Sequence, residues 1–164
     1  MTTVRMTTVE RNVLIADDEL PARERLQRLL TELPGFGVAA TCGTGAEALE
    51  LIGRLKPDIV LLDIRMPGMT GIEVARHLSA LDGPPAVIFT TAYEQYAIEA
   101  FEAHAVGYLL KPVRRERLTA ALEHAARLGK PVLRELADEK VFAPRRPVAV
   151  RVRDELKLIP IDAT

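Results

Sequence analysis

Cysteine is nearly absent from this sequence of 164 residues, which contains only Cys42. A single cysteine excludes an intramolecular disulfide framework and a cysteine-based zinc finger, so the cytoplasm is the expected compartment. Long apolar runs are also missing: none approaches the ~20 residues of a membrane span. The first residues lack the apolar block of a signal peptide. We therefore expect neither membrane insertion nor secretion.

An excess of charge of one sign is also missing, since 22 lysines and arginines face 23 aspartates and glutamates. A net charge of −1 gives no global attraction to nucleic acid or to membranes. Hydrophobic residues make up 48% of the chain and charged residues 27%, which excludes wholesale disorder and allows a sizeable core. The length suits one soluble domain with a tail.

Short, nearly continuous apolar runs alternate with longer helical patterns over residues 12–128. Such runs predict strands buried on both faces, which are typical of a parallel sheet. The strand–helix units predict an α/β domain. Right-handed crossovers favour a flavodoxin-like (βα)5 doubly wound parallel sheet of strand order 2-1-3-4-5. The expected strands contain Val13–Ala16, Val38–Cys42, Ile59–Leu62, Ala86–Thr90 and Val106–Leu110.

Two of the helical patterns open on a sequence typical of a capping box. In this motif a threonine side chain accepts a backbone hydrogen bond, and a glutamate further along reaches back to the cap. The expected boxes pair Thr44 with Glu47 and Thr70 with Glu73.

In the fourth helical segment, we expect Phe101 to contribute to packing.

The pattern divides the chain into four parts. Residues 1–11, which contain the repeated sequence Met-Thr-Thr-Val, are an N-terminal extension, and residues 12–128 form the α/β domain. Residues 129–146 are predicted to be a charged linker. Over residues 147–164 apolar and basic residues alternate, which predicts the beginning of an antiparallel hairpin as a C-terminal extension.

Polar side chains follow the ends of the strands in this topology. Asp17 and Asp18 come directly after the first strand, and Asp63 follows the third. Thr91 follows the fourth strand, and Lys111 follows the fifth. Because ligands of open parallel sheets bind beyond the carboxyl ends of the strands, we expect these side chains to share one crevice. Each aspartate alone could simply cap a helix or a turn, but the three together favour a shared site.

Three carboxylates at close range repel one another unless they share a divalent cation. Mg²⁺ prefers a few carboxylates, water and phosphate oxygens, which makes this crevice a candidate magnesium site. Phosphoryl transfer needs positioning, charge neutralisation and a nucleophile in line, and a carboxylate can be that nucleophile. The crevice is therefore suited to forming an aspartyl phosphate.

These residues and their surroundings resemble the response regulator receiver domain of two-component signalling over residues 12–128. The motifs occur in the family's order and with similar spacing, so the resemblance is specific. The sequence around Thr91 and the Tyr-Leu-Leu-Lys-Pro run further resemble the LytR/AlgR subfamily. The motifs are Asp17-Asp18, Asp63-Ile64-Arg65-Met66-Pro67-Gly68, Gly71, Thr91-Ala92 and Tyr108-Leu109-Leu110-Lys111-Pro112.

Carried over to this sequence, the resemblance implies that Asp63 is the phosphoacceptor. Asp18, Asp63 and the backbone carbonyl of Arg65 would bind Mg²⁺, and Asp17 would contribute directly or through water. The phosphoryl group would come from a sensor histidine kinase. The protein would then be a signalling phosphoacceptor that assists its own phosphorylation and dephosphorylation, not an enzyme acting on other substrates.

The resemblance also implies how the phosphoryl group would act. Thr91 would bind one of its oxygens and Lys111 would pair with its charge, while Tyr108 would turn inward as Thr91 moves. The peptide bond between Lys111 and Pro112 would be cis. Transcriptional output would come from a LytTR-type DNA-binding domain. Residues 147–164 resemble an incomplete start of that domain, so contact with DNA would need the complete domain.

A homodimer through the fourth helix, the fifth strand and the fifth helix is expected from charge. Opposite charges on two helices suit a two-fold interface, in which the acidic helix of one protomer meets the basic helix of the other. Solvated helix faces would carry the same charges, so both interpretations stay open. The residues concerned are Glu94, Glu99 and Glu102 on the fourth helix and Arg114, Arg115 and Arg117 on the fifth.

Other functions also stay open. The chain could be a stand-alone receiver that acts through protein–protein contacts, including a metal-independent one. A haloacid-dehalogenase-like phosphatase also uses an aspartyl nucleophile, but it needs a second aspartate where this sequence has Arg65. A flavodoxin would cradle a phosphate in the loop after the first strand, which the acidic run Asp17–Glu19 would repel.

Overall fold

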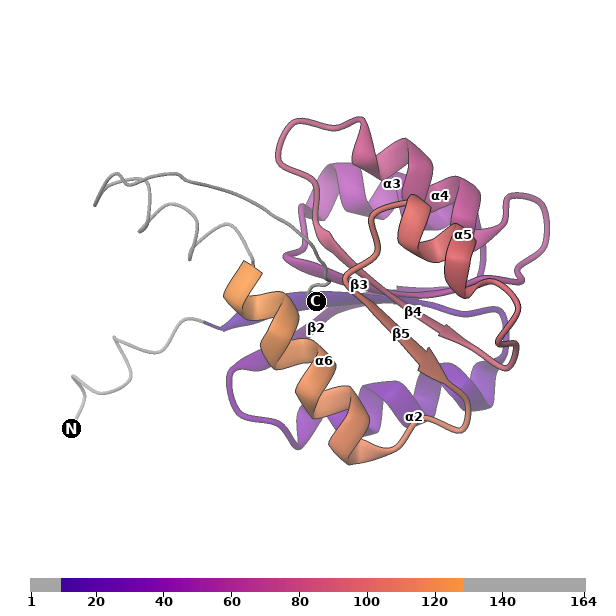
Figure 1. Cartoon of the computed structure of the whole chain (residues 1–164). Helices are drawn as coiled ribbons and strands as arrows, with labels where there is room; N and C mark the ends of the chain where they lie inside the picture. The colour runs from indigo at the N-terminus through magenta and orange to yellow at the C-terminus, as the bar shows by residue number, and fades with distance from the viewer. Residues whose placement is uncertain (1–9, 129–164) are drawn as a thin grey trace, which may run out of the picture. The chain divides into compact units, whose positions relative to one another are not determined.

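The computed structural model describes residues 10–128, which form one five-stranded sheet (Figure 1). All neighbouring strands are parallel, and their order is β2-β1-β3-β4-β5, as the sequence predicted. The predicted linker (129–146), the predicted DNA-binding start (147–164) and residues 1–9 of the extension lie outside the described residues. The strands are β1 (Arg11–Ala16), β2 (Phe36–Cys42), β3 (Ile59–Asp63), β4 (Ala86–Thr91) and β5 (Gly107–Leu110).

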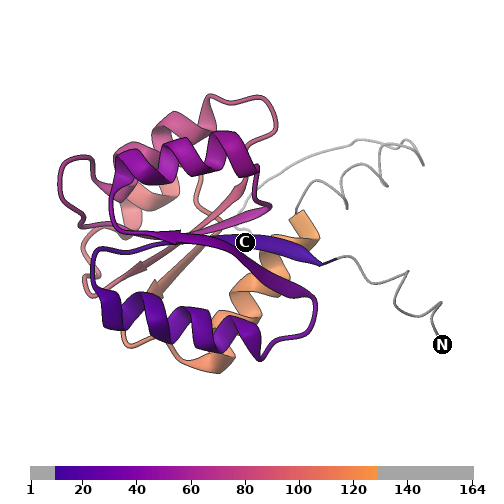
Figure 2. The same cartoon turned by 180° about the vertical axis from the view of Figure 1, so that it is seen from behind.

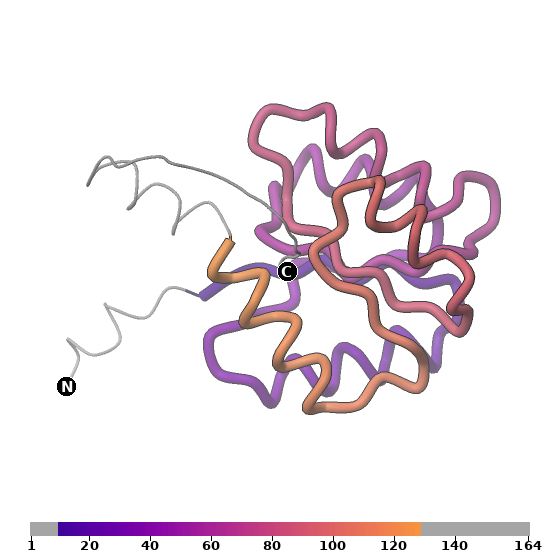
Figure 3. Tube along the Cα trace, viewed as in Figure 1, coloured from indigo at the N-terminus to yellow at the C-terminus, as the bar shows by residue number. Residues whose placement is uncertain are grey.

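Helices cover both faces of the sheet in the described residues. α3, α4 and α5 pack on one face and α2 and α6 on the other, so the sheet is the middle of three layers (Figures 1 and 2). The chain trace shows how the connections between strands place the helices on these two sides (Figure 3). Within residues 10–128, no helix has the length and apolarity to span a membrane. The helices are α2 (Leu20–Thr31), α3 (Gly45–Leu55), α4 (Gly71–Ser79), α5 (Ala97–Glu102) and α6 (Arg115–Leu128).

Two hydrophobic cores form because successive side chains of a strand point to opposite faces of the sheet. In β1, Leu14 and Ala16 belong to the core under α3, α4 and α5, whereas Val13 belongs to the core under α2 and α6. This double burial accounts for the continuous apolar runs. Ala16 lies beside Leu62 of β3, so the residues that follow these two strands emerge at the same edge of the sheet.

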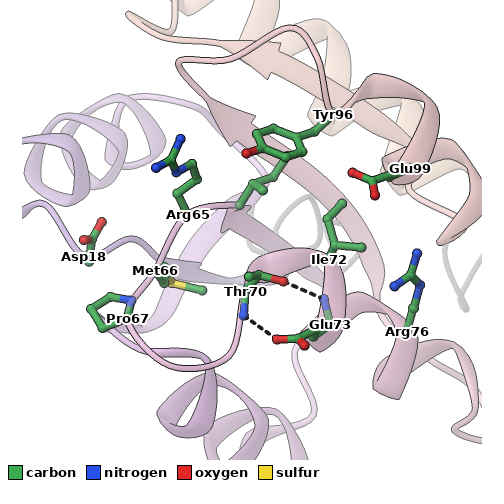
Figure 4. Close-up of a pocket in the computed structure, with 11 residues that line it drawn as sticks. Asp18, Arg65, Met66, Pro67, Thr70, Ile72, Glu73, Arg76, Tyr96 and Glu99 are labelled. Atoms are coloured by element: carbon green, nitrogen blue, oxygen red, sulfur yellow. Dashed lines mark hydrogen bonds between the residues drawn. The ribbon is translucent and has the colours of Figure 1, made fainter.

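The two predicted capping boxes differ in the structure. At α4, the Thr70 hydroxyl accepts from the N–H of Glu73, whose carboxylate accepts from the N–H of Thr70, so this box is complete (Figure 4). At α3, the Thr44 hydroxyl accepts from the N–H of Glu47 at 3.1 Å. The Glu47 carboxylate, however, accepts from the N–H of Gly43 at 3.2 Å. The prediction of a full box at Thr44 is therefore wrong in its second hydrogen bond.

Gly71 opens α4 where the backbone passes close to the end of β3. Its N–H donates to the carbonyl of Ile64 at 2.7 Å. A Cβ atom at this position would lie 2.1 Å from the carbonyl oxygen of Asp63, far inside van der Waals contact. Glycine therefore allows α4 to pack directly against the segment that carries Asp63.

Phe101 does not pack in the core as its helical spacing predicted. α5 is only six residues long and buries just one of them, Ala100. Phe101 is 69% exposed and Ile98 is 74% exposed. Leu110 of β5 is exposed as well. α5 and β5 therefore present large apolar side chains to solvent.

Candidate functional site

Three carboxylates meet at the carboxyl edge of the sheet, where the sequence predicted them. Asp17 and Asp18 follow β1, and Asp63 is the last residue of β3. Each contributes an oxygen atom, and these atoms all lie within 4.8 Å of one another. Asp17 is fully buried, Asp63 is 4% exposed, and Asp18 faces solvent. The cluster therefore combines two buried acids with one at its rim.

Lys111 brings a positive charge to this cluster. Lys111 follows β5. Its backbone N–H donates to the carbonyl of Thr91 at 2.8 Å, which fixes the residue beside β4. Its Nζ lies 2.8 Å from Oδ2 of Asp17 and 3.4 Å from Oδ2 of Asp63. The Lys111–Pro112 peptide bond is cis, as the resemblance implied. The ammonium thus bridges the two buried carboxylates.

Burial, followed by the charge of Asp17, raises the pKa of Asp63 from 3.8 to about 7, against the opposing effect of Lys111. The pKa of Lys111 is raised as well. Its burial alone would lower that pKa, but the contact with Asp17 and the charge of Asp63 outweigh the burial. Asp63 would therefore ionise fully at neutral pH only with the help of a further cation.

A pH dependence follows from this environment, and we expect the pKa of Asp63 to be about 7 in protein treated with a chelator. The folded chain then holds this proton more tightly than the unfolded chain does. The resulting stabilisation is complete below the ordinary pKa of 3.8 and is lost as the pH rises through about 7. Mg²⁺ should therefore raise the melting temperature more at about pH 8 than at about pH 6.

Thermal unfolding at both pH values, with Mg²⁺ and with a chelator, measures this difference. Asp63→Asn is the control, because it cannot titrate and should give the same small shift at both pH values. An equal gain from Mg²⁺ at the two pH values in the unmodified chain would contradict the raised pKa.

One residue that sequence reasoning did not single out, Tyr93, connects Thr91 to Tyr108. Thr91 is fully buried at the end of β4, and its hydroxyl accepts from the N–H of Tyr93 at 3.2 Å. The carbonyl of Tyr93 accepts from the hydroxyl of Tyr108 in β5. Tyr108 is half-buried, and this burial raises its pKa. The predicted switch residue is therefore hydrogen-bonded to the same loop that Thr91 holds.

The donor set of the cluster fits a hard divalent cation. Mg²⁺ takes oxygen ligands, and all three clustered residues are carboxylates. Within residues 10–128, Oδ2 of Asp17 is buried and accepts no hydrogen bond of regular geometry, although the Lys111 ammonium is close to it. A bound cation would reduce the repulsion between the acids.

A cavity of about 720 Å³ opens beside the cluster, bounded by the loop after β3, by α4 and by α5 (Figure 4). Asp18 and the side chain of Arg65 both line this cavity. In Figure 4, Arg65 lies between Asp18 and Tyr96. The cavity therefore adjoins the acidic cluster at Asp18, and the loop after β3 brings Arg65 to the same place.

Two further residues that sequence reasoning did not single out hold Asp17 in place. The N–H of Glu19 donates to Oδ1 of Asp17 at 2.9 Å. Arg23 of α2 donates from Nη1 to the carbonyl of Asp17 at 2.7 Å. An aspartate that binds the N–H two residues on is a common turn pattern, so Glu19 carried a signal in the sequence. The contact of Arg23 with the Asp17 carbonyl depends on where α2 lies, so no sequence pattern indicated it.

Comparison with known proteins places the chain among signalling proteins. A family model described as "Response regulator receiver domain" matches residues 13–123. The positive alginate biosynthesis regulatory protein of Pseudomonas aeruginosa is 50% identical over 155 residues, which are 92% of this chain and 62% of that protein. The sensory transduction protein LytT of Bacillus anthracis is 34% identical over 153 residues, with the same two coverages. The chain thus spans about 62% of the length of these curated relatives.

A solved structure shares the fold. The CheX-CheY-BeF3-Mg+2 complex from Borrelia burgdorferi contains a chain that is 30% identical, with a TM-score of 0.66. The match covers 72% of this chain and 90% of that one. The family match itself lies within the described residues, which contain the acidic cluster and Lys111.

Proposed function

The chain belongs to the response regulator receiver domain family, and we propose that it accepts a phosphoryl group on Asp63 from a phosphohistidine of a sensor histidine kinase. The environment of Asp63 carries this proposal. Its buried carboxyl has a pKa raised to about 7, lies 3.4 Å from an ammonium and belongs to a group of three carboxylates. Once its charge is balanced, such a carboxylate is a suitable nucleophile for phosphoryl transfer.

In this proposal, Asp18, Asp63 and the backbone carbonyl of Arg65 would hold Mg²⁺, and Asp17 would contribute directly or through water. When bound, the ion would offset the negative charge of the carboxylates and of the phosphoryl oxygens. The all-carboxylate donor set and the burial of Asp17 and Asp63 support this assignment.

Asp63 would attack the phosphorus atom with one carboxylate oxygen while the P–N bond of the phosphohistidine breaks. A P–O bond to Asp63 replaces it, and the imidazole nitrogen keeps the electron pair of the broken bond. Lys111 would then turn its ammonium toward the new phosphoryl oxygens. Thr91 would donate its hydroxyl hydrogen to one of these oxygens.

The same step would move Tyr108. A phosphoryl group adds roughly −1.5 to −2 charges and strong acceptor oxygens. If Thr91 turns toward that group, its hydroxyl gives up the hydrogen bond that it accepts from the N–H of Tyr93 in this structure. The loop after β4 then loses one of its hydrogen bonds, and this loop contains the Tyr93 carbonyl that accepts from the Tyr108 hydroxyl. Tyr108 would turn inward as a result.

Transcriptional output would pass through a LytTR-type DNA-binding domain. The relatives include a biosynthesis regulatory protein and a sensory transduction protein named LytT, which support a signalling role of this kind. The chain covers 62% of each of them. DNA contact is therefore assigned to the complete domain that residues 147–164 would begin, and residues 12–128 would act as its phosphorylation-controlled switch.

The experiment that tests this function is phosphorylation of the purified chain by acetyl phosphate, followed by intact-mass measurement. We expect a mass gain of one phosphoryl group in the presence of Mg²⁺ and no gain in the presence of a chelator. Hydroxylamine, which cleaves acyl phosphates, should remove the group. A label that resists hydroxylamine, or that forms without a divalent cation, would contradict the proposal.

We also propose a homodimer through α5, β5 and α6 that phosphorylation strengthens. Individual exposed ion pairs contribute only ~0–1 kcal/mol, so an apolar centre has to supply most of the affinity. The exposed Ile98 and Phe101 of α5 and Leu110 of β5 are suited to that role. A groove on this face is lined by charged residues of both signs, Glu94, Arg114 and Arg117.

Arg117 offers a sharper test of this interface than Arg115. Arg115 forms an ion pair with Glu32 of α2 in the same chain, so its charge already has a partner. Arg117→Glu should weaken the phosphorylated dimer by about tenfold, because it sets like charges against each other. Arg115→Gln is the matched control and should change the dimer by less than about twofold. Sedimentation equilibrium measures both, and equal effects of the two variants would contradict the interface.

A further inference from the structure

Arg65 and Tyr93 form a contact that the proposed function does not use. The guanidinium carbon of Arg65 lies 4.7 Å from the centroid of the Tyr93 ring, which is the geometry of a cation–π interaction. The rings of Tyr93 and Tyr96 meet edge to face, with centroids 6.2 Å apart. Arg65 and Tyr96 both line the cavity beside the acidic cluster (Figure 4). The contact thus joins the loop after β3 to the loop after β4.

Tyr93 occupies a central place in the hydrogen bonds around the site. Its N–H donates to the Thr91 hydroxyl at 3.2 Å, and its carbonyl accepts from the Tyr108 hydroxyl. Its ring, in contrast, contacts Arg65. A single residue therefore connects the loop that carries Arg65 with the ends of β4 and β5.

The guanidinium of Arg65 is available to a stronger partner. Its side chain is exposed, and among residues 10–128 no carboxylate lies within 4 Å of it. A cation–π contact at an exposed site is weak. A phosphoryl group offers the same guanidinium charge-assisted, bidentate hydrogen bonds, which are stronger. A phosphoryl group on Asp63 would therefore compete with the Tyr93 ring for Arg65.

We propose that Arg65 is a second cation for the phosphoryl group. Its guanidinium contacts the Tyr93 ring in the unphosphorylated chain and binds the phosphoryl oxygens after phosphorylation. The inference rests on the proposed function, because it needs the phosphoryl group to be on Asp63. When Arg65 leaves the ring, Tyr93 loses its tie to the loop after β3. Phosphorylation would then affect Tyr108 through the Tyr93 carbonyl, which accepts from the Tyr108 hydroxyl, without any change at the Thr91 hydroxyl.

The test is a double-mutant cycle on the affinity of the full chain for beryllofluoride, a phosphoryl mimic, measured by calorimetry with Mg²⁺ at saturation. Arg65→Gln removes the cation, Tyr93→Leu removes the ring, and a third variant combines the two changes. Tyr93→Phe is the matched control, because it keeps the ring face and removes only the hydroxyl group.

The expected effects have opposite signs. Arg65→Gln should weaken binding of the mimic by about tenfold, because a charged donor is lost. Tyr93→Leu should strengthen it by about threefold, because Arg65 no longer has to leave the ring. Tyr93→Phe should change it by less than about twofold. In the chain that already carries Arg65→Gln, Tyr93→Leu should have no effect, because the contact between the guanidinium and the ring is already absent.

Two outcomes would overturn the inference alone. One is a Tyr93→Leu variant that weakens binding of the mimic, or strengthens it equally with and without Arg65. The other is an Arg65→Gln variant that binds the mimic as tightly as the wild-type chain does. A wild-type chain that binds no mimic, or an Asp63→Asn variant that binds it equally well, would instead overturn the proposed function, and the inference with it.

Discussion

Asp63→Asn is expected to abolish the Mg²⁺-dependent phosphorylation of the chain. An amide oxygen is a poor nucleophile, and the substitution also removes a charged oxygen from the cluster that would hold the metal ion. The shape of the side chain is retained, and the repulsion between Asp63 and the buried Asp17 is lost. Without Mg²⁺, the variant should therefore melt at or above the temperature of the wild-type chain. Intact mass after treatment with acetyl phosphate, together with thermal unfolding, measures both effects.

Asp58→Asn is the matched control for this experiment. Asp58 precedes β3 at the opposite end of the strand, where its carboxylate accepts from the N–H of Asn12 at 2.9 Å. This variant changes the same residue type next to the opposite end of the same strand and should be labelled as fully as the wild-type chain. If Asp63→Asn were labelled to the same extent, the phosphoacceptor would have to be another residue.

Gly71→Ala is expected to lower the free energy of unfolding by about 3 kcal/mol and to weaken Mg²⁺ binding at the same time. The new Cβ would lie 2.1 Å from the carbonyl oxygen of Asp63 and 2.9 Å from the Cα of Ile64. These are backbone atoms, so no side-chain rotation can relieve the clash. α4 and the loop after β3 would have to move apart, and Asp63 and Arg65 would be displaced with that loop.

Gly53→Ala provides the comparison, because it makes the same substitution in a helix with free space around it. Nothing lies within 4 Å of a Cβ built on Gly53 in α3. This variant should gain about 0.5–1 kcal/mol, since alanine favours the helix more than glycine does. Denaturant titration with and without Mg²⁺ measures both variants. An unchanged midpoint for Gly71→Ala would show that the segment after β3 has more room than the structure gives it.

The sheet and its acidic cluster could be predicted because both depend on strand order. Nearly continuous apolar runs indicate strands covered on both faces, and the helical patterns between them indicate parallel pairing. Once β1 and β3 are neighbours, Asp17 and Asp63 must emerge at one edge of the sheet. Lys111 and Thr91 reach the same edge for the same reason, since β5 pairs with β4.

Contacts that depend on the placement of helices and loops could not be predicted in this way. Phe101 has a helical spacing, but α5 is too short to bury it. Arg23 reaches the backbone of Asp17 only because α2 packs beside β1. The contact between Arg65 and Tyr93 joins two loops far apart in the sequence, and no local pattern indicates their approach.

The aromatic residues near the site give the protein an optical signal of its own. Tyr93, Tyr96 and Tyr108 are the three tyrosines of the chain, and the sequence contains no tryptophan. Two of these rings meet edge to face, and the third carries the hydroxyl that binds the Tyr93 carbonyl. Tyrosine absorption and fluorescence therefore arise entirely from the residues around the proposed switch. Rapid mixing with a phosphodonor could follow the switch in time on the unlabelled chain, with no dye and no added tryptophan.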